Sequence, residues 1–266
     1  MGIAHRMNHI FLPNGKTFIL AIDHGLNFNV LPAMKNPGKI IRECASAGVN
    51  AFLATPGLAG KFADDFLGRG IILRIDGGIS TLGREPHPLQ TIVDPEEALV
   101  SGADAIVTMS FPGSQFEGES LGSVARNIQK AHRWGLPVVV EALPRGFEGG
   151  EDSRTPKNII YACRQAAELG ADVIKTEYTG SVETMCELVE SVYVPVVILG
   201  GSKKIPERQF LQEIRDAMDA GAAGVAIGRN IWGHEKPALY AAAISRLIHD
   251  NLGVEEALRE LNPPEK

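Results

Sequence analysis

Short β-rich runs alternate with helical patterns along almost the entire chain, and this alternation restricts the possible folds more than any other feature. The strand-like runs are Phe18–Asp23, Ala51–Thr55, Ile71–Asp76, Ala105–Ser110, Pro137–Leu143, Asp172–Tyr178, Pro195–Gly200 and Gly224–Arg229. The helical patterns include Asn36–Ala47, Asp94–Ser101, Leu121–Trp134, Pro156–Leu169, Val182–Ser191, Glu207–Ala220 and Pro237–Asp250. Because helices separate consecutive strands, the sequence predicts a parallel sheet.

The junctions between helices and strands repeat the same small residues. Gly-Ala or Ala-Gly pairs occur at Gly48, Gly102, Gly170 and Gly221, where glycine can adopt the left-handed conformation that ends a helix. Eight successive strand–helix units fit a closed (β/α)8 TIM barrel better than an open doubly wound sheet. No GxGxxG motif follows the first strand-like run, as it often does in a doubly wound sheet. No Pro/Ser-rich linker or block of charge interrupts the chain, so we predict one barrel domain over residues 1–266.

The charge balance of the chain argues against several classes of partner. Its 266 residues carry a formal net charge of −6 and a sequence pI of about 5.7, whereas nucleic acids and anionic membranes bind concentrated positive charge. The three cysteines show no CxxC spacing and the histidines do not cluster, so we expect no metal and no cofactor. The chain has neither a long apolar span nor a secretory signal, which predicts a cytoplasmic protein.

A single lysine, Lys175, lies within an apolar strand-like run. Burial among valine and isoleucine disfavours the ammonium form, and the neutral amine can add to a carbonyl and form a Schiff base. A Schiff base accepts electrons from a neighbouring carbon–carbon bond, which is the chemistry of an aldolase. The alternative is a lysine at a strand end whose amine reaches solvent.

Two glycine motifs follow the last two strand-like runs, Gly200-Gly201-Ser202-Lys203 and Gly228-Arg229-Asn230. The active site of a barrel lies at the C-terminal ends of its strands, and backbone N–H groups after the seventh and eighth strands commonly bind phosphate. Each motif alone is equally typical of a turn or a strand end. Together they predict a phosphate site for a small-molecule substrate at Gly201, Ser202, Lys203, Gly228 and Arg229.

Acidic residues at the same strand ends are candidates for proton transfer. Asp23 closes the first run, and its carboxylate could position substrate hydroxyls, move protons, or cap the following loop. Glu177 lies two residues beyond Lys175 and therefore on the same face of a regular strand. Glu177 could change the charge around the lysine, or form a structural ion pair with Lys175 or Lys203.

Four segments resemble the motifs of one family, the barrel-fold class I aldolases that include deoxyribose-phosphate aldolase and archaeal-type fructose-bisphosphate aldolase. The segments are Ala21–Gly25, Val173–Thr176, Val197–Lys203 and Gly221–Trp232, and the likeness extends over about residues 15–250. The resemblance implies a Schiff base on Lys175, a functional aspartate at Asp23, and phosphate at Gly201, Ser202, Gly228 and Arg229 with Lys203 nearby. It also implies a homo-oligomer, since rings such as decamers occur among relatives.

One position departs from the family pattern. Family members commonly carry an acid–base tyrosine in the fifth strand near a Pro-Arg-Gly, and this chain has Pro144-Arg145-Gly146 but Leu143 at the tyrosine position. Leucine has no proton to transfer, so Glu141, Glu177 or Asp23 would take over that work. Otherwise the reaction differs from standard aldol cleavage.

The leading prediction is a Schiff-base lyase of carbohydrate metabolism that resembles fructose-bisphosphate aldolase and acts on a phosphorylated ketose or related phosphorylated ketone. Relatives of this fold include a heptulosonate-type transaldolase and a thiolase for a phosphorylated signalling pentanedione, and Gly200–Arg208 resembles the thiolase. A transferase with the same lysine is therefore one alternative. A phosphate-binding barrel without catalysis is another. A metal-dependent lyase is weaker, because Asp23, His24, Asp76 and His87 show no fixed ligand spacing.

Overall fold

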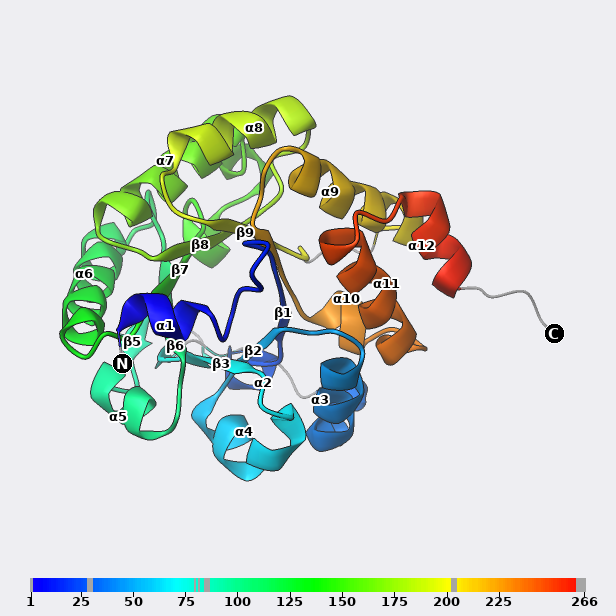
Figure 1. Cartoon of the computed structure of the whole chain (residues 1–266). Coiled ribbons are helices and arrows are strands. Elements are labelled where there is room, and N and C mark those ends of the chain that lie inside the picture. The colour runs from blue at the N-terminus through cyan, green and yellow to red at the C-terminus, as the bar shows by residue number, and fades with distance from the viewer. Residues whose placement is uncertain are drawn as a thin grey trace.

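A computed structural model describes residues 2–27, 31–78, 80, 82–83, 87–201 and 205–261 of the chain. Within these ranges, eight parallel strands close into a barrel in the order β1-β2-β3-β6-β7-β8-β9-β10 (Figure 1). The barrel strands are β1 Thr17–Ala21, β2 Ala51–Ala54, β3 Gly70–Arg74, β6 Ala105–Ser110, β7 Val138–Ala142, β8 Val173–Thr176, β9 Val196–Leu199 and β10 Gly224–Ile227. The predicted (β/α)8 fold class is confirmed.

Helices surround the barrel on its outer side, as Figure 1 shows. The α-helices are α1 Ile3–Met7, α2 His24–Asn27, α3 Pro37–Ser46, α4 Pro56–Lys61, α5 Pro95–Val100, α6 Glu117–Arg133, α7 Pro156–Glu168, α8 Val182–Ser191, α9 Glu207–Asp219, α10 Arg229–Trp232, α11 Pro237–His249 and α12 Val254–Leu261. Short 3-10 helices occur at Pro32–Lys35, Ala63–Phe66, Gly146–Glu148 and Glu151–Ser153. Among the helices described, none is long and apolar enough to cross a membrane.

Local signals explain where several helices begin. Proline occupies the first turn of α3, α5 and α7. The residue just before each helix accepts a hydrogen bond from a backbone N–H of the first turn, and these residues are Asn36 before α3, Asp94 before α5 and Thr155 before α7. Both features satisfy or remove backbone N–H groups that have no partner within the helix. The sequence therefore specifies these boundaries locally.

Some elements differ from the prediction. α6 begins at Glu117 rather than at Leu121, because the polar first turn of the helix reads as a loop in the sequence. The helices α1 and α12 were not predicted, nor was the antiparallel ribbon of β4 Asp76–Gly77 and β5 Gln90–Thr91, which follows β3. Elements this short or this polar have little of the hydrophobic periodicity from which helices and strands are predicted.

The core consists of two apolar layers. The larger layer lies between the strands and the helices, and includes Phe18, Phe52 and Trp232. The smaller layer fills the barrel interior with one or two side chains from each strand, among them Ile19, Leu53, Ile72, Val107, Val139, Val173, Val197 and Ala226. Ile10, which follows α1, belongs to this inner layer, so the N-terminal segment closes one end of the barrel. The polar residues gather at the opposite end, beyond the carboxyl ends of the strands.

Candidate active site

Lys175 lies inside the barrel, near the carboxyl end of β8. Side chains alternate along a strand, so Lys175 shares the inward face with Val173, which belongs to the inner apolar layer. Lys175 is level with Glu141 of β7 and Val197 of β9 in the strand register. Only 5% of the lysine is exposed, and its Nζ donates a hydrogen bond of 2.8 Å to Glu141 Oε1. The amine is therefore buried within an ion pair rather than extended into solvent.

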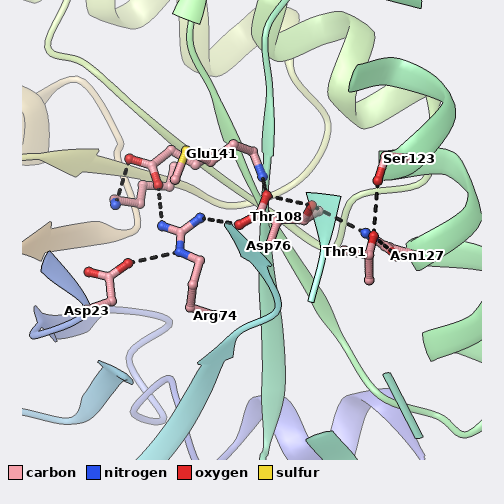
Figure 2. Close-up of polar contacts among 10 residues, drawn as sticks. Asp23, Arg74, Asp76, Thr91, Thr108, Ser123, Asn127 and Glu141 are labelled. Carbon is pink, nitrogen blue, oxygen red and sulfur yellow. Dashed lines mark hydrogen bonds and ion pairs between the residues drawn. The ribbon is translucent and has the colours of Figure 1, made fainter. Parts of the chain in front are cut away.

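Arg74, the last residue of β3, joins three carboxylates at the same end of the barrel (Figure 2). Its Nε donates to Asp23 Oδ2 at 2.9 Å, its Nη2 to Glu141 Oε2 at 2.7 Å, and its Nη1 to Asp76 Oδ1 at 3.1 Å. The arginine is 1% exposed. A buried guanidinium is stable only when its charge is offset and its N–H groups are bonded, and these carboxylates do both.

Asp76 connects this cluster to the outside of the barrel. Its Oδ2 accepts hydrogen bonds from Thr108 Oγ1 at 3.0 Å and from the backbone N–H of Met109 at 2.5 Å. Figure 2 follows the chain of contacts onward through Asn127 of α6 to Thr91 of β5. The network attaches the β4–β5 ribbon to β3, β6 and α6, and it leaves Arg74 anchored on the side away from Lys175.

The charges in the cluster control the protonation of Glu141. Burial alone would raise the pKa of this carboxyl, but the neighbouring cations of Lys175 and Arg74 and their hydrogen bonds outweigh it and lower the pKa to about 2. Arg74 in turn has its pKa raised, because the attraction of Asp23, Asp76 and Glu141 exceeds the opposing effect of burial. In the free protein, Glu141 is therefore an anion held between two cations.

His24 follows Asp23 at the start of α2 and packs edge-on against Trp232, with 5.4 Å between ring centroids. Burial lowers the pKa of this imidazole, and the charges of Arg229 and Lys175 lower it further against the opposing effects of Asp23 and Glu141. The histidine is therefore neutral at physiological pH, a state that suits packing against an aromatic ring.

The predicted phosphate residues lie at the ends of two adjacent strands. Gly201 lies two residues after β9 and has φ +66°, and Gly228 lies between β10 and α10. A Cβ at Gly228 would lie 2.5 Å from the carbonyl oxygen of Ala21, which explains why this position is glycine. Arg229 is exposed beside it. The predicted residues Ser202 and Lys203 lie outside the described residues.

Glu177 lies apart from the buried cluster. β8 ends at Thr176, and Glu177 forms an ion pair of 3.3 Å with Arg154 Nε. The same arginine donates hydrogen bonds to the carbonyl oxygens of Pro144 and Gly146 in the loop after β7. The contact described for Glu177 thus links it to that loop, and Lys203, one of the lysine partners considered from sequence, lies outside the described residues.

Leu143 is buried against Met109, Phe111 and Leu89 in a small apolar cluster at the barrel mouth. The position that carries a tyrosine in the family pattern therefore belongs to a hydrophobic surface here. Near Lys175, the described structure instead has the carboxylate of Glu141, which shares Arg74 with the carboxylate of Asp23.

Arg74 was missed as a site residue from the sequence. The sequence feature that could have identified Arg74 is the one that identified Lys175, a lone cation at the last inward position of an apolar strand, here Gly70–Arg74. What the strand pattern does not reveal is the reach of the side chain across the barrel to Asp23 and Glu141.

The chain is similar in sequence and fold to known aldolases and a related synthase. Residues 17–234 match the family described as DeoC/LacD family aldolase. The chain is 35% identical to a 2-amino-3,7-dideoxy-D-threo-hept-6-ulosonate synthase of Halobacterium salinarum, covering 97% of this chain and 95% of that one. It is also 35% identical to a class 1 fructose-bisphosphate aldolase of the same species, covering 92% and 95%.

One solved structure combines a similar fold with a trapped reaction state. It is an archaeal fructose-1,6-bisphosphate aldolase whose catalytic lysine is covalently bound to the carbinolamine intermediate of the substrate. The structural similarity has a TM-score of 0.84 at 32% sequence identity, and covers 93% of this chain and 99% of that one.

Proposed function

The chain belongs to the DeoC/LacD aldolase family, and from that membership we propose that it is a Schiff-base enzyme that uses Lys175 to cleave or form a carbon–carbon bond in a phosphorylated ketose or related phosphorylated ketone. The observation that carries the proposal is the buried ion pair of Lys175 with Glu141, in which the lysine nitrogen lies 2.8 Å from a carboxylate oxygen that accepts its hydrogen bond. Relatives named for fructose bisphosphate support the substrate class.

The first half of the reaction requires a neutral amine. Nζ of Lys175 adds to the ketone carbon, and a proton passes from the nitrogen to the former carbonyl oxygen to give a neutral carbinolamine. The carbinolamine hydroxyl then takes a further proton from a neighbouring acid and leaves as water, which gives a cationic iminium. The iminium nitrogen keeps one N–H, which can donate to Glu141 as the ammonium group does. Glu141 thus has a cationic partner both before the addition and after the loss of water.

Cleavage then moves electrons toward the nitrogen. A base removes the proton of the substrate hydroxyl, the carbon–carbon bond breaks, its electron pair forms the neutral enamine, and the aldehyde leaves. Loss of the nitrogen charge removes one of the two cations that lower the pKa of Glu141, so this carboxylate becomes a stronger base at that stage. We assign proton transfer to Asp23 and Glu141, with Glu177 as a further candidate at the mouth.

The phosphate of the substrate is assigned to the loops after β9 and β10. Gly201 and Gly228 provide space for close approach of backbone N–H groups, and the exposed guanidinium of Arg229 provides positive charge. Ser202 and Lys203 are assigned to the same phosphate site on the basis of their sequence motif alone. Homo-oligomeric assembly and cytoplasmic residence belong to the same proposal.

A transferase is the second candidate, and one finding favours it: the chain is as similar to the heptulosonate synthase as to the aldolase. The two reactions share the iminium and differ in the fate of the enamine. A lyase releases a free aldehyde without added acceptor, whereas a transferase consumes its donor only when the acceptor is present. Product analysis with and without acceptor aldehydes distinguishes them.

Borohydride trapping tests the proposal. The protein is reduced in the presence of dihydroxyacetone phosphate, fructose bisphosphate and other phosphorylated ketones, and its intact mass is measured. We expect an adduct on the wild type and on Lys157→Met, which removes an exposed lysine of α7, but none on Lys175→Met. Absence of any wild-type adduct would contradict the proposal, and calorimetric binding of the same ligands would then indicate a non-catalytic barrel.

A further inference from the structure

Arg74 occupies the centre of the buried cluster without contacting the nitrogen of Lys175 in the described network. Each nitrogen of its guanidinium group bonds a carboxylate from a different segment: Asp23 after β1, Asp76 of β4 and Glu141 of β7. Two of these carboxylates are the assigned proton-transfer groups. One planar side chain therefore determines the spacing between them.

We propose that Arg74 is a positioning residue of the Schiff-base reaction, which presents one oxygen of Glu141 and one of Asp23 to the reacting atoms and keeps both carboxylates in place while Lys175 changes charge. This inference rests on the proposed function. Arg74 binds Oε2 of Glu141 and Oδ2 of Asp23. The second oxygens remain for chemistry, since Oε1 of Glu141 accepts from Lys175 and Oδ1 of Asp23 lies 3.7 Å from His24 Nδ1.

The charge balance shows why a permanent cation is needed at this place. Within the described cluster, three carboxylates face two cations, Arg74 and Lys175. The amine must be neutral when it attacks the ketone, and at that moment Arg74 is the cation that these carboxylates still contact. Arginine stays protonated throughout, whereas burial of unpaired carboxylates would favour their neutral forms.

The fixed geometry of Arg74 does not depend on the reacting lysine. Asp76 holds Nη1, and Asp76 itself accepts from the N–H of Met109 and from Thr108. A lysine at this position would present a single ammonium on a flexible stem, and could not bridge the carboxylates in one plane. The network thus provides a rigid support on the side of the guanidinium that faces away from Lys175.

The test compares Arg74→Met and Arg74→Lys with the wild type in the full-length protein. The rate of adduct formation on Lys175 with dihydroxyacetone phosphate and cyanoborohydride is measured from pH 3 to 8, a range that extends toward the lowered pKa of Glu141. We expect a loss of about 100-fold at neutral pH in Arg74→Met, because misplaced reacting groups cost rates of this order. We also expect the acid limb of the profile to move up by about one pH unit, since Glu141 loses the guanidinium that lowers its pKa.

Among the described residues, the charged and titratable groups around the Glu141–Lys175 pair are Arg74 of β3, Asp23 and His24 beyond β1, Asp76 of β4 and Arg229 beyond β10. Burial lowers the pKa of His24. Because Arg74 lowers the pKa of Glu141, the limb that moves when Arg74 is replaced is assigned to Glu141.

A matched structural control removes a contact of the network and leaves the guanidinium intact. Thr108→Val keeps the side-chain shape but deletes the hydroxyl that donates to Asp76. We expect it to lower the melting temperature and leave the acid limb in place. Arg74→Lys keeps the positive charge but not the planar fork, so we expect it to stay slow at neutral pH. A wild-type rate in Arg74→Lys overturns the inference, and this comparison decides it if Arg74→Met does not fold. An acid limb that does not move in Arg74→Met also overturns it. A wild type without any adduct refutes the proposed function, and this inference with it.

Discussion

Replacement of Glu141 by glutamine should make the stability of the protein less dependent on acid. Glutamine keeps the shape of the side chain but removes the carboxylate whose folded-state pKa is lowered from its ordinary 4.5 to about 2. At 1.36 kcal/mol per pH unit, this difference corresponds to about 3 kcal/mol of stability that ionised Glu141 contributes. Glu141 is 8% exposed, so solvent screening reduces this contribution little.

The sign follows from the direction of the pKa change. A carboxyl whose pKa is lowered on folding stabilises the protein fully above its unfolded value of 4.5, and that stabilisation is lost as the pH falls toward 2. We therefore expect wild type to be more stable than Glu141→Gln by about 3 kcal/mol at pH 7, and this difference to shrink to about 1 kcal/mol at pH 3.

Urea unfolding at pH 7, 5, 4 and 3, followed by tryptophan fluorescence and circular dichroism, measures the gap. Glu187→Gln, which alters an exposed position of α8, is the matched control and should change stability by less than about 0.5 kcal/mol at every pH. A gap between wild type and Glu141→Gln that is the same at pH 7 and pH 3 would refute the assignment of an ionised, doubly paired Glu141.

Three further predictions concern thiols, the phosphate loops and metal dependence. Burial raises the pKa of Cys44 and of Cys163 to about 12, so a thiol reagent at pH 8 should modify at most Cys186 in the folded protein and all three cysteines after unfolding. Gly228→Ala should raise the inhibition constant of inorganic phosphate at least about tenfold, because the new methyl group would collide with the Ala21 carbonyl; an unchanged constant would place phosphate elsewhere. Activity should survive prolonged EDTA treatment, and its loss with recovery on adding a divalent cation would indicate a metal-dependent reaction.

The fold was predictable because the pattern that specifies it is local. Each strand is a short apolar run, and glycines such as Gly48 and Gly170 end the preceding helices with positive φ. The inward position of Lys175 follows from the same alternation along β8. These features depend on neighbours in sequence, and need no knowledge of distant contacts.

The polar network depends on contacts between distant segments and was only partly predictable. Arg74 bonds Glu141 across 67 positions of sequence, and no spacing rule reports such a contact. The contact of Glu177 with Arg154 was not considered, because β8 ends at Thr176, two residues before the predicted strand end, and Arg154 enters from the loop after β7. The sequence pattern gives neither the distance that a long side chain such as Arg74 spans nor the exact residue at which a strand such as β8 ends.

A crystal structure of the protein after borohydride reduction with dihydroxyacetone phosphate would show directly whether Lys175 forms the Schiff base. We expect continuous density from Nζ of Lys175 to the substrate carbon, with the phosphate within hydrogen-bond distance of backbone N–H groups after β9 and β10. A reduced adduct on a different lysine, or a phosphate in these loops with Lys175 unmodified, would contradict it.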